Sequence, residues 1–264
     1  FLPWALQNRY SVTVQKNEID LCLFQSVNFY QNKKIQLRAD PTSKNQLDSI
    51  LSFEPVFGTP DPVWDKDFIN KIGGWNEKIE VWDDPEIHAR AMVNKARIEW
   101  GDTIPDCLIR CDNVDEFKLT NFKRSLQRYE TILDSYLELY KSLNTAQKDL
   151  FKKNIISQIY RYAPSLERRQ ILSITEWLRK NNFIEHKEYF AFKKLTLNYF
   201  KFCKIPIIRR YFYKKLLSNV IPVSVEKYND DKIIQTFSDK FHIELSKKKY
   251  PFLEKINLNL KKKK

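Results

Sequence analysis

The most regular hydrophobic pattern in the chain lies in the segment that follows residue 113. Large apolar residues recur there at alternating spacings of four and three, the heptad pattern of a helix that packs along another helix. This pattern predicts a long helix with a coiled-coil-like seam, whose partner helix lies later in this chain or on another subunit. An ordinary core-facing helix of a bundle produces the same pattern. The expected partner-helix interface consists of Phe122, Leu126, Tyr129, Leu133, Tyr136, Tyr140 and Leu143.

Helical patterns also precede and follow this seam. Residues 83–86 read Asp-Asp-Pro-Glu, which supplies a cap, a proline for the first turn and acidic groups near the positive end of the helix dipole. A helix is therefore expected from residue 83 to about residue 100, and Gly101 and Pro105 end it. Further helices are expected over residues 150–162, 166–180, 185–202, 207–217 and 230–240.

The first 82 residues lack a helical pattern. Short alternating pieces at residues 10–14 and 19–24 favour extended segments, and four prolines between residues 41 and 62 bias the backbone toward extended geometry. The sequence therefore predicts a mostly α protein in three regions. Residues 1–82 form an irregular, extended N-terminal arm, residues 83–145 form a helical region with the heptad seam, and residues 146–264 form a basic helical region with a Lys-rich tail.

Charge is distributed unevenly along the chain. Lys and Arg number 46 and Asp and Glu 33, so the formal net charge is +13. Residues 1–145 carry 18 basic and 22 acidic side chains, whereas residues 146–264 carry 28 basic and 11 acidic ones. A positive excess confined to one half indicates a partner that offers phosphate, anionic lipid or an acidic protein face.

The sequence offers little for catalysis or cofactor binding. Its four glycines, Gly58, Gly73, Gly74 and Gly101, form neither a P-loop nor a dinucleotide-binding fingerprint. The close pair Cys107 and Cys111 has no second pair to complete a metal site. The candidate catalytic, cofactor-binding and metal-binding residues are therefore none, and a non-enzymatic role is favoured. Scattered cysteines indicate a reducing compartment, and a start without methionine is what a cleaved import signal would leave.

Five short strings occur in an order that resembles a known family. They are Trp75-Asn76-Glu77, Ile98-Glu99-Trp100, Val114-Asp115-Glu116-Phe117, Asn219-Val220-Ile221-Pro222 and Lys247-Lys248-Lys249-Tyr250-Pro251-Phe252. In this order they resemble subunit d of the mitochondrial ATP synthase peripheral stalk. The chain departs from that family by about 75 additional residues before Trp75 and by a longer basic region before Asn219.

The resemblance implies a non-catalytic role and a set of partners. A member of this family is a helical protein on the matrix side, peripheral to the mitochondrial inner membrane, that packs along stalk subunit b and its neighbours and resists rotor torque. It needs no cofactor and no small-molecule substrate. The heptad seam would then be the bundle contact, and the basic half would face acidic stalk subunits or the anionic lipid surface.

A ribosomal role is the alternative interpretation. Basic clusters in the C-terminal half alternate with aromatic residues, as in residues 193–215, so lysines and arginines would meet phosphates while rings stack on unpaired bases. A mitochondrial ribosomal protein that binds rRNA through this half fits the charge. At helical spacing, however, aromatic residues flanked by Lys are more often core residues beneath a solvated basic face.

Overall fold

The structure is a computed structural model, and the residues that it describes are mostly helical with two small sheets. The prediction of a mostly α protein is confirmed at this level. The described residues are 1–16, 18–29, 35–39, 46–52, 57–79, 82–101, 104–110, 129–161, 166–201, 207, 211 and 231–247.

Each of the two three-stranded sheets pairs one strand from residues 21–29 with one strand from residues 98–110. In the first, β1 (Leu21–Leu23) pairs antiparallel with β4 (Pro62–Trp64) and parallel with β5 (Ile98–Trp100). In the second, three strands are ordered β3-β2-β6, with β2 antiparallel to β3 and parallel to β6. Their bounds are Ser26–Phe29 for β2, Ile35–Leu37 for β3 and Cys107–Arg110 for β6.

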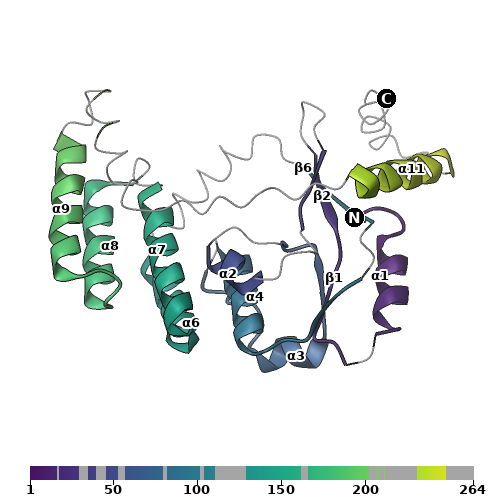
Figure 1. The fold of residues 1–264 in the computed structure, drawn as a ribbon, viewed down its shortest axis with the longest axis horizontal. Helices are drawn as coiled ribbons and strands as arrows, with labels where there is room; N and C mark the ends of the chain where they lie inside the picture. Colours follow the sequence, from purple (N-terminus) through teal and green to yellow (C-terminus); the bar gives the residue numbers. More distant parts are fainter. Residues whose placement is uncertain are drawn as a thin grey trace.

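Helices lie on both sides of the strands (Figure 1). On one side lie α1 and α11, and on the other lie α2 and α4, followed by α6 to α9. The helices are α1 (Ala5–Thr13), α2 (Gln46–Leu51), α3 (Lys66–Lys71), α4 (Asp83–Val93), α6 (Tyr129–Ser142), α7 (Thr145–Arg161), α8 (Arg168–Lys180), α9 (His186–Lys201) and α11 (Asp231–Lys247).

The helices on the second side form stacked pairs. Helix α2 contacts both α4 and α7, α4 contacts α6, α6 contacts α8, and α8 contacts α9. Ring contacts join α6 to α7, because Tyr136 stacks on Phe151 with 5.5 Å between ring centroids. We call α6 to α9 the helical layer. In Figure 1, α9 lies at the end of this layer that is farthest from the strands.

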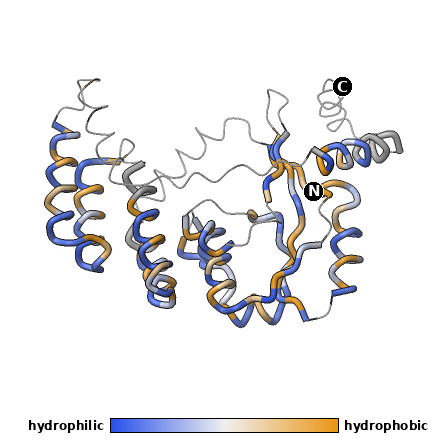
Figure 2. Tube along the Cα trace, in the orientation of Figure 1, coloured by the Kyte–Doolittle hydropathy of each residue, from blue (hydrophilic) through white to orange (hydrophobic). Residues whose placement is uncertain are grey.

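One large hydrophobic core joins the first sheet to the helical layer. It includes Leu21 and Leu23 of β1, Ile87 of α4, Phe151 of α7 and Tyr199 of α9, all 4% exposed or less. Figure 2 shows hydrophobic residues concentrated along the strands and alternating with hydrophilic residues along α8 and α9. A second, smaller cluster contains Leu2, Val27, Leu37 and Phe237, which places α11 against the N-terminal segment.

The expected N-terminal arm is not confirmed. Residues 21 to 27 are all buried and lie at the centre of the part formed by the two sheets and α1 to α4, which we call the sheet region. A continuous apolar run of this kind is typical of a strand covered on both faces. Gly101 lies against the same segment, and a Cβ there would come within 2.6 Å of the Phe24 ring. Residues 10–13, which were expected to be extended, belong to α1.

The helix expected over residues 83–100 begins as predicted but is shorter. Asp83 is the first residue of α4, and the helix ends at Val93. Two residues later, Lys95 has a φ of 59°, which is outside the helical range. The following residues Ile98–Trp100 pair with β1, since strand pairing there outweighs local helix propensity.

The long supercoiled helix is not confirmed either. Helix α6 has 14 residues, and the longest described helices have 17. Phe122 and Leu126, the first two seam positions, lie outside the described residues.

A buried histidine makes the stability of this fold depend on pH. His88 is fully buried between the rings of Phe57 and Trp64, at centroid distances of 4.4 and 6.0 Å. Burial, reinforced by the charge of Arg38, lowers its pKa from 6.5 to about 3. The unfolded chain therefore binds a proton near pH 6.5 that the folded chain does not bind until about pH 3.

We predict that the free energy of unfolding falls as the pH is lowered from about 6.5 toward 3, measured by urea unfolding at a series of pH values. His88→Phe, which retains an aromatic ring in the site, should flatten this slope. Comparison with this variant separates the effect of the imidazole from that of Asp61. Burial raises the pKa of Asp61, so its protonation makes the folded state more stable as the pH falls, which is the opposite change. Equal slopes in the two proteins would contradict the prediction.

Candidate functional site

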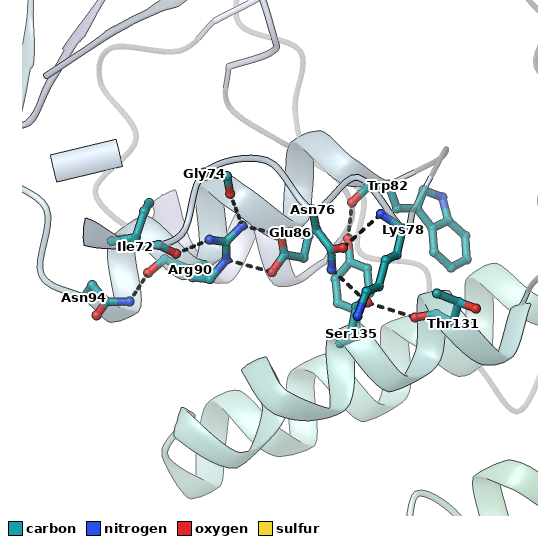
Figure 3. Close-up of polar contacts among 11 residues, drawn as sticks. Ile72, Gly74, Asn76, Lys78, Trp82, Glu86, Arg90, Asn94, Thr131 and Ser135 are labelled. Carbon is teal, nitrogen blue, oxygen red and sulfur yellow. Dashed lines mark hydrogen bonds and ion pairs between the residues drawn. The ribbon is translucent and has the colours of Figure 1, made fainter. Parts of the chain in front are cut away.

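The loop between α3 and α4 is held in place by one guanidinium group. Arg90 donates two hydrogen bonds to the carboxylate of Glu86, at 2.9 and 2.8 Å. The same side chain donates to the backbone carbonyl of Gly74 at 2.7 Å and to that of Ile72 (Figure 3). Glu86 lies one helical turn before Arg90, so α4 itself fixes the orientation of this fork. The loop is thereby anchored to α4 at two carbonyl groups.

The same loop reaches across to α6. Asn76 donates from its side-chain amide to the hydroxyl of Ser135 at 2.9 Å, and Ser135 donates to the carbonyl of Thr131 at 2.8 Å. The carbonyl oxygen of the Asn76 side chain accepts from the backbone N–H of Lys78 at 3.1 Å. Figure 3 shows these contacts running from the loop onto α6. Asn76 therefore links the sheet region to the helical layer.

A second link joins the start of α4 to α6. The Tyr136 hydroxyl donates to the backbone carbonyl of Trp82 at 2.6 Å, and the two rings meet edge to face at a centroid distance of 6.4 Å. Burial raises the pKa of Tyr136 well above its ordinary value, so the phenol keeps its proton and remains a donor. We call the contacts of Arg90, Asn76, Ser135, Tyr136 and Trp82 the joint.

The described seam residues face the interior of this chain. Leu133, Tyr136 and Leu143 are buried, at 2, 2 and 4% exposure, and Tyr140 is half-buried against Phe183 at a centroid distance of 4.6 Å. For Tyr129 the structure describes the backbone in α6. The seam positions from 133 to 143 are therefore covered by α4, α7, α8 and the turn after α8.

The family-string residues fall into two groups. Of the first string, Asn76 lies in the joint and is bonded to α6, whereas Trp75 and Glu77 are exposed and lie outside it. Ile98, Glu99 and Trp100 form β5, and Glu99 pairs with Lys16 at 2.7 Å. The remaining positions lie outside the described residues, namely Val114, Asp115, Phe117, Asn219, Pro222, Lys249, Tyr250 and Pro251.

A buried ion pair was not anticipated by the sequence analysis. Arg9 of α1 donates two hydrogen bonds to the Asp106 carboxylate, at 2.7 and 2.6 Å, and a third to the carbonyl of Pro60 at 2.6 Å. Its guanidinium also lies over the rings of Phe1 and Phe24. Arg9 and Asp106 are 97 positions apart, so no local pattern in the sequence could have indicated the pair.

The polar groups of the joint and of the Arg9–Asp106 pair are engaged in hydrogen bonds within the chain. Within the part of the chain that the structure describes, no group of three His, Cys, Asp or Glu side chains could hold a metal ion. Burial raises the pKa of the Cys22 and Cys107 thiols, so neither offers a reactive thiolate. Of the helices in the described residues, none is long and apolar enough to cross a membrane.

Comparisons with protein-family models, curated proteins and solved structures find no match to this chain. The joint and the buried core are therefore the features on which a functional proposal can be based.

We predict that replacing Arg90 lowers the free energy of unfolding more than replacing Arg97 does. Arg90→Ala should lower the free energy of unfolding by roughly 2–3 kcal/mol, because it leaves the largely buried Glu86 carboxylate without a cation and two carbonyls without a donor. Arg97→Ala is the matched control, since its guanidinium is 55% exposed, and it should cost less than about 1 kcal/mol. Urea unfolding of the three proteins measures both changes, and similar losses for the two variants would refute the assignment of the joint.

Proposed function

We propose that this chain is a non-catalytic structural subunit of the mitochondrial ATP synthase peripheral stalk. It would lie on the matrix side of the inner membrane and resist rotor torque together with stalk subunit b and its neighbours. The observation that carries the proposal is the bond from Asn76, the central residue of the Trp-Asn-Glu string, to Ser135 of α6.

The joint supports a mechanical role. A torque-bearing subunit must transmit force between its parts without bending at the boundary between them. Here two hydrogen bonds, from Asn76 to Ser135 and from Tyr136 to Trp82, join the sheet region to the helical layer, and one hydrophobic core continues beneath them. Close-packed interiors deform little under load, so the two parts would move together.

The seam contributes to this role inside the chain, as in the expectation of a core-facing helix. Its described positions pack on this chain's own helices, so their stiffness is internal, and contact with stalk partners would use other surfaces. Exposed residues on α7 and α9 are candidates for those surfaces.

Fractionation of the native complexes tests the proposal. The full chain, tagged at its own chromosomal locus, should migrate with the intact ATP synthase on a native gel after mild detergent extraction of mitochondria, as identified by mass spectrometry. Its depletion should reduce assembled stalk while leaving ribosome profiles unchanged. Recovery in ribosomal fractions, with none in the ATP synthase band, would overturn the proposal.

The arrangement of lysines on α9 favours the rRNA-binding alternative as a second candidate. Lys187, Lys194 and Lys201 are exposed and follow one another at intervals of seven, so they lie along one face of the helix. A helix face of this kind could lie along a phosphate backbone.

For this alternative we predict a steep salt dependence. Three phosphate contacts would lower the affinity for RNA by about 20- to 40-fold between 50 and 200 mM salt, because counterions are released on binding. Fluorescence anisotropy with a structured RNA measures this fall, and charge reversal of the three lysines should weaken binding and flatten the slope. Lys66→Glu with Lys95→Glu, in the sheet region, is the control. An affinity insensitive to salt, or equal losses in both variants, would exclude RNA binding through α9.

A further inference from the structure

A groove of about 550 Å³ runs between α7 and α9. Helix α7 contributes Asp149, Lys152, Lys153 and Ile156 to its lining, and α9 contributes Lys187, Glu188, Ala191 and Phe192. Ile156 and Phe192 are 8 and 5% exposed, so they form an apolar floor, while Lys153 and Lys187 are exposed at the rim. The groove thus combines an apolar base with charged walls.

The three lysines of the groove form no ion pair with another described residue. Lys152, Lys153 and Lys187 take part in none of the ion pairs found there, although pairs are formed by Lys141, Arg169 and Arg179 elsewhere in the helical layer. The Glu188 carboxylate is already engaged, because it accepts a hydrogen bond from the backbone N–H of Glu185 at 2.7 Å at the start of α9. The groove therefore presents three ammonium groups and two carboxylates, those of Asp149 and Glu188, so its lining carries mixed charge with a positive excess of one.

We infer that this groove binds an amphipathic helix of a partner protein, with its apolar side on Ile156 and Phe192 and acidic side chains against Lys152, Lys153 and Lys187. A trough between two helices accepts the side-chain ridge of a third helix, as in the packing of globular proteins. This inference rests on the structural role proposed above and specifies the chemistry of the partner.

The mixed charge of the lining favours a protein over a nucleic acid or a lipid. Asp149 lies among the lysines, where it would repel a continuous row of phosphates. A helix can place a lysine or an amide opposite Asp149 and glutamates or aspartates opposite the three ammonium groups, so it satisfies both signs of charge.

Site-directed photo-crosslinking tests the inference in the full chain. Position 191 is exposed within the groove, and p-benzoylphenylalanine placed there, in cells, should crosslink to a protein segment with an apolar face and an acidic face. Lys153→Glu with Lys187→Glu should lower the yield of this crosslink at least tenfold, and lysines in place of the acidic residues of the captured segment should restore it.

Lys66→Glu with Lys95→Glu changes the same charge on exposed lysines of the sheet region and should leave the crosslink unchanged. Circular dichroism of all variants confirms that the fold is retained. A crosslink to RNA or lipid, a captured segment without acidic residues, or a yield that survives reversal of the groove lysines would overturn the inference.

The outcomes separate this inference from the function proposed above. A charge-dependent crosslink to an acidic helix outside the ATP synthase would support the groove assignment and refute the stalk assignment. Migration with the ATP synthase, combined with a crosslink yield that does not change when the groove lysines are reversed, would support the stalk assignment and refute the groove assignment.

Discussion

The guanidinium group of Arg90 fixes the path of the loop on which the two parts of the protein depend. It binds the Glu86 carboxylate and two backbone carbonyls, and it thereby places Asn76 within reach of Ser135. Each of these groups would lose hydrogen bonds if the loop moved. Because polar groups in a partly buried setting are costly to leave unpaired, the loop has one favoured position. The helical layer is consequently held at a defined orientation to the strands.

This arrangement explains how a chain with few glycines and two very small sheets builds a continuous core. The strands are only three or four residues long, too short to be stable as isolated sheets. Helices α1 and α4 cover them, and the buried pair of Arg9 with Asp106 connects α1 to the segment before β6. Stability therefore comes from contacts between elements that are distant in sequence. A structural role fits this organisation, because its polar groups are used for internal bonding.

The sequence predicted the helices of the helical layer well, but it missed the helices of the first 82 residues, where the piece at 10–14 that was expected to be extended lies largely in α1. The expected helices at residues 166–180 and 185–202 correspond closely to α8 and α9, since their apolar periodicity is strong and Glu167 with Gln170 forms a capping box. The extended piece expected at residues 19–24 contains β1, but β5 and β6 were missed, because they pair with residues about 80 positions away, for which periodicity carries no signal. In the joint, the Glu86 and Arg90 pair follows from helical spacing, but the carbonyls of Ile72 and Gly74 that Arg90 also binds could not be inferred. The seam pattern correctly marked Leu133 and Tyr136 as packing residues without revealing that their partners are in this chain.

The parallel pairing of β1 with β5 also determines the order in which the protein can assemble. Leu21 pairs with Ile98 in the first sheet and Val27 with Leu108 in the second, so the two sheets are not both complete until translation has passed residue 108. Helices form from local contacts within microseconds, whereas pairings of high contact order form late. β1 and β2 can pair with β4 and β3 earlier, but the edges of residues 21–27 that β5 and β6 cover stay open throughout synthesis of the first third of the chain. During that interval these edges are what a chaperone would need to shield.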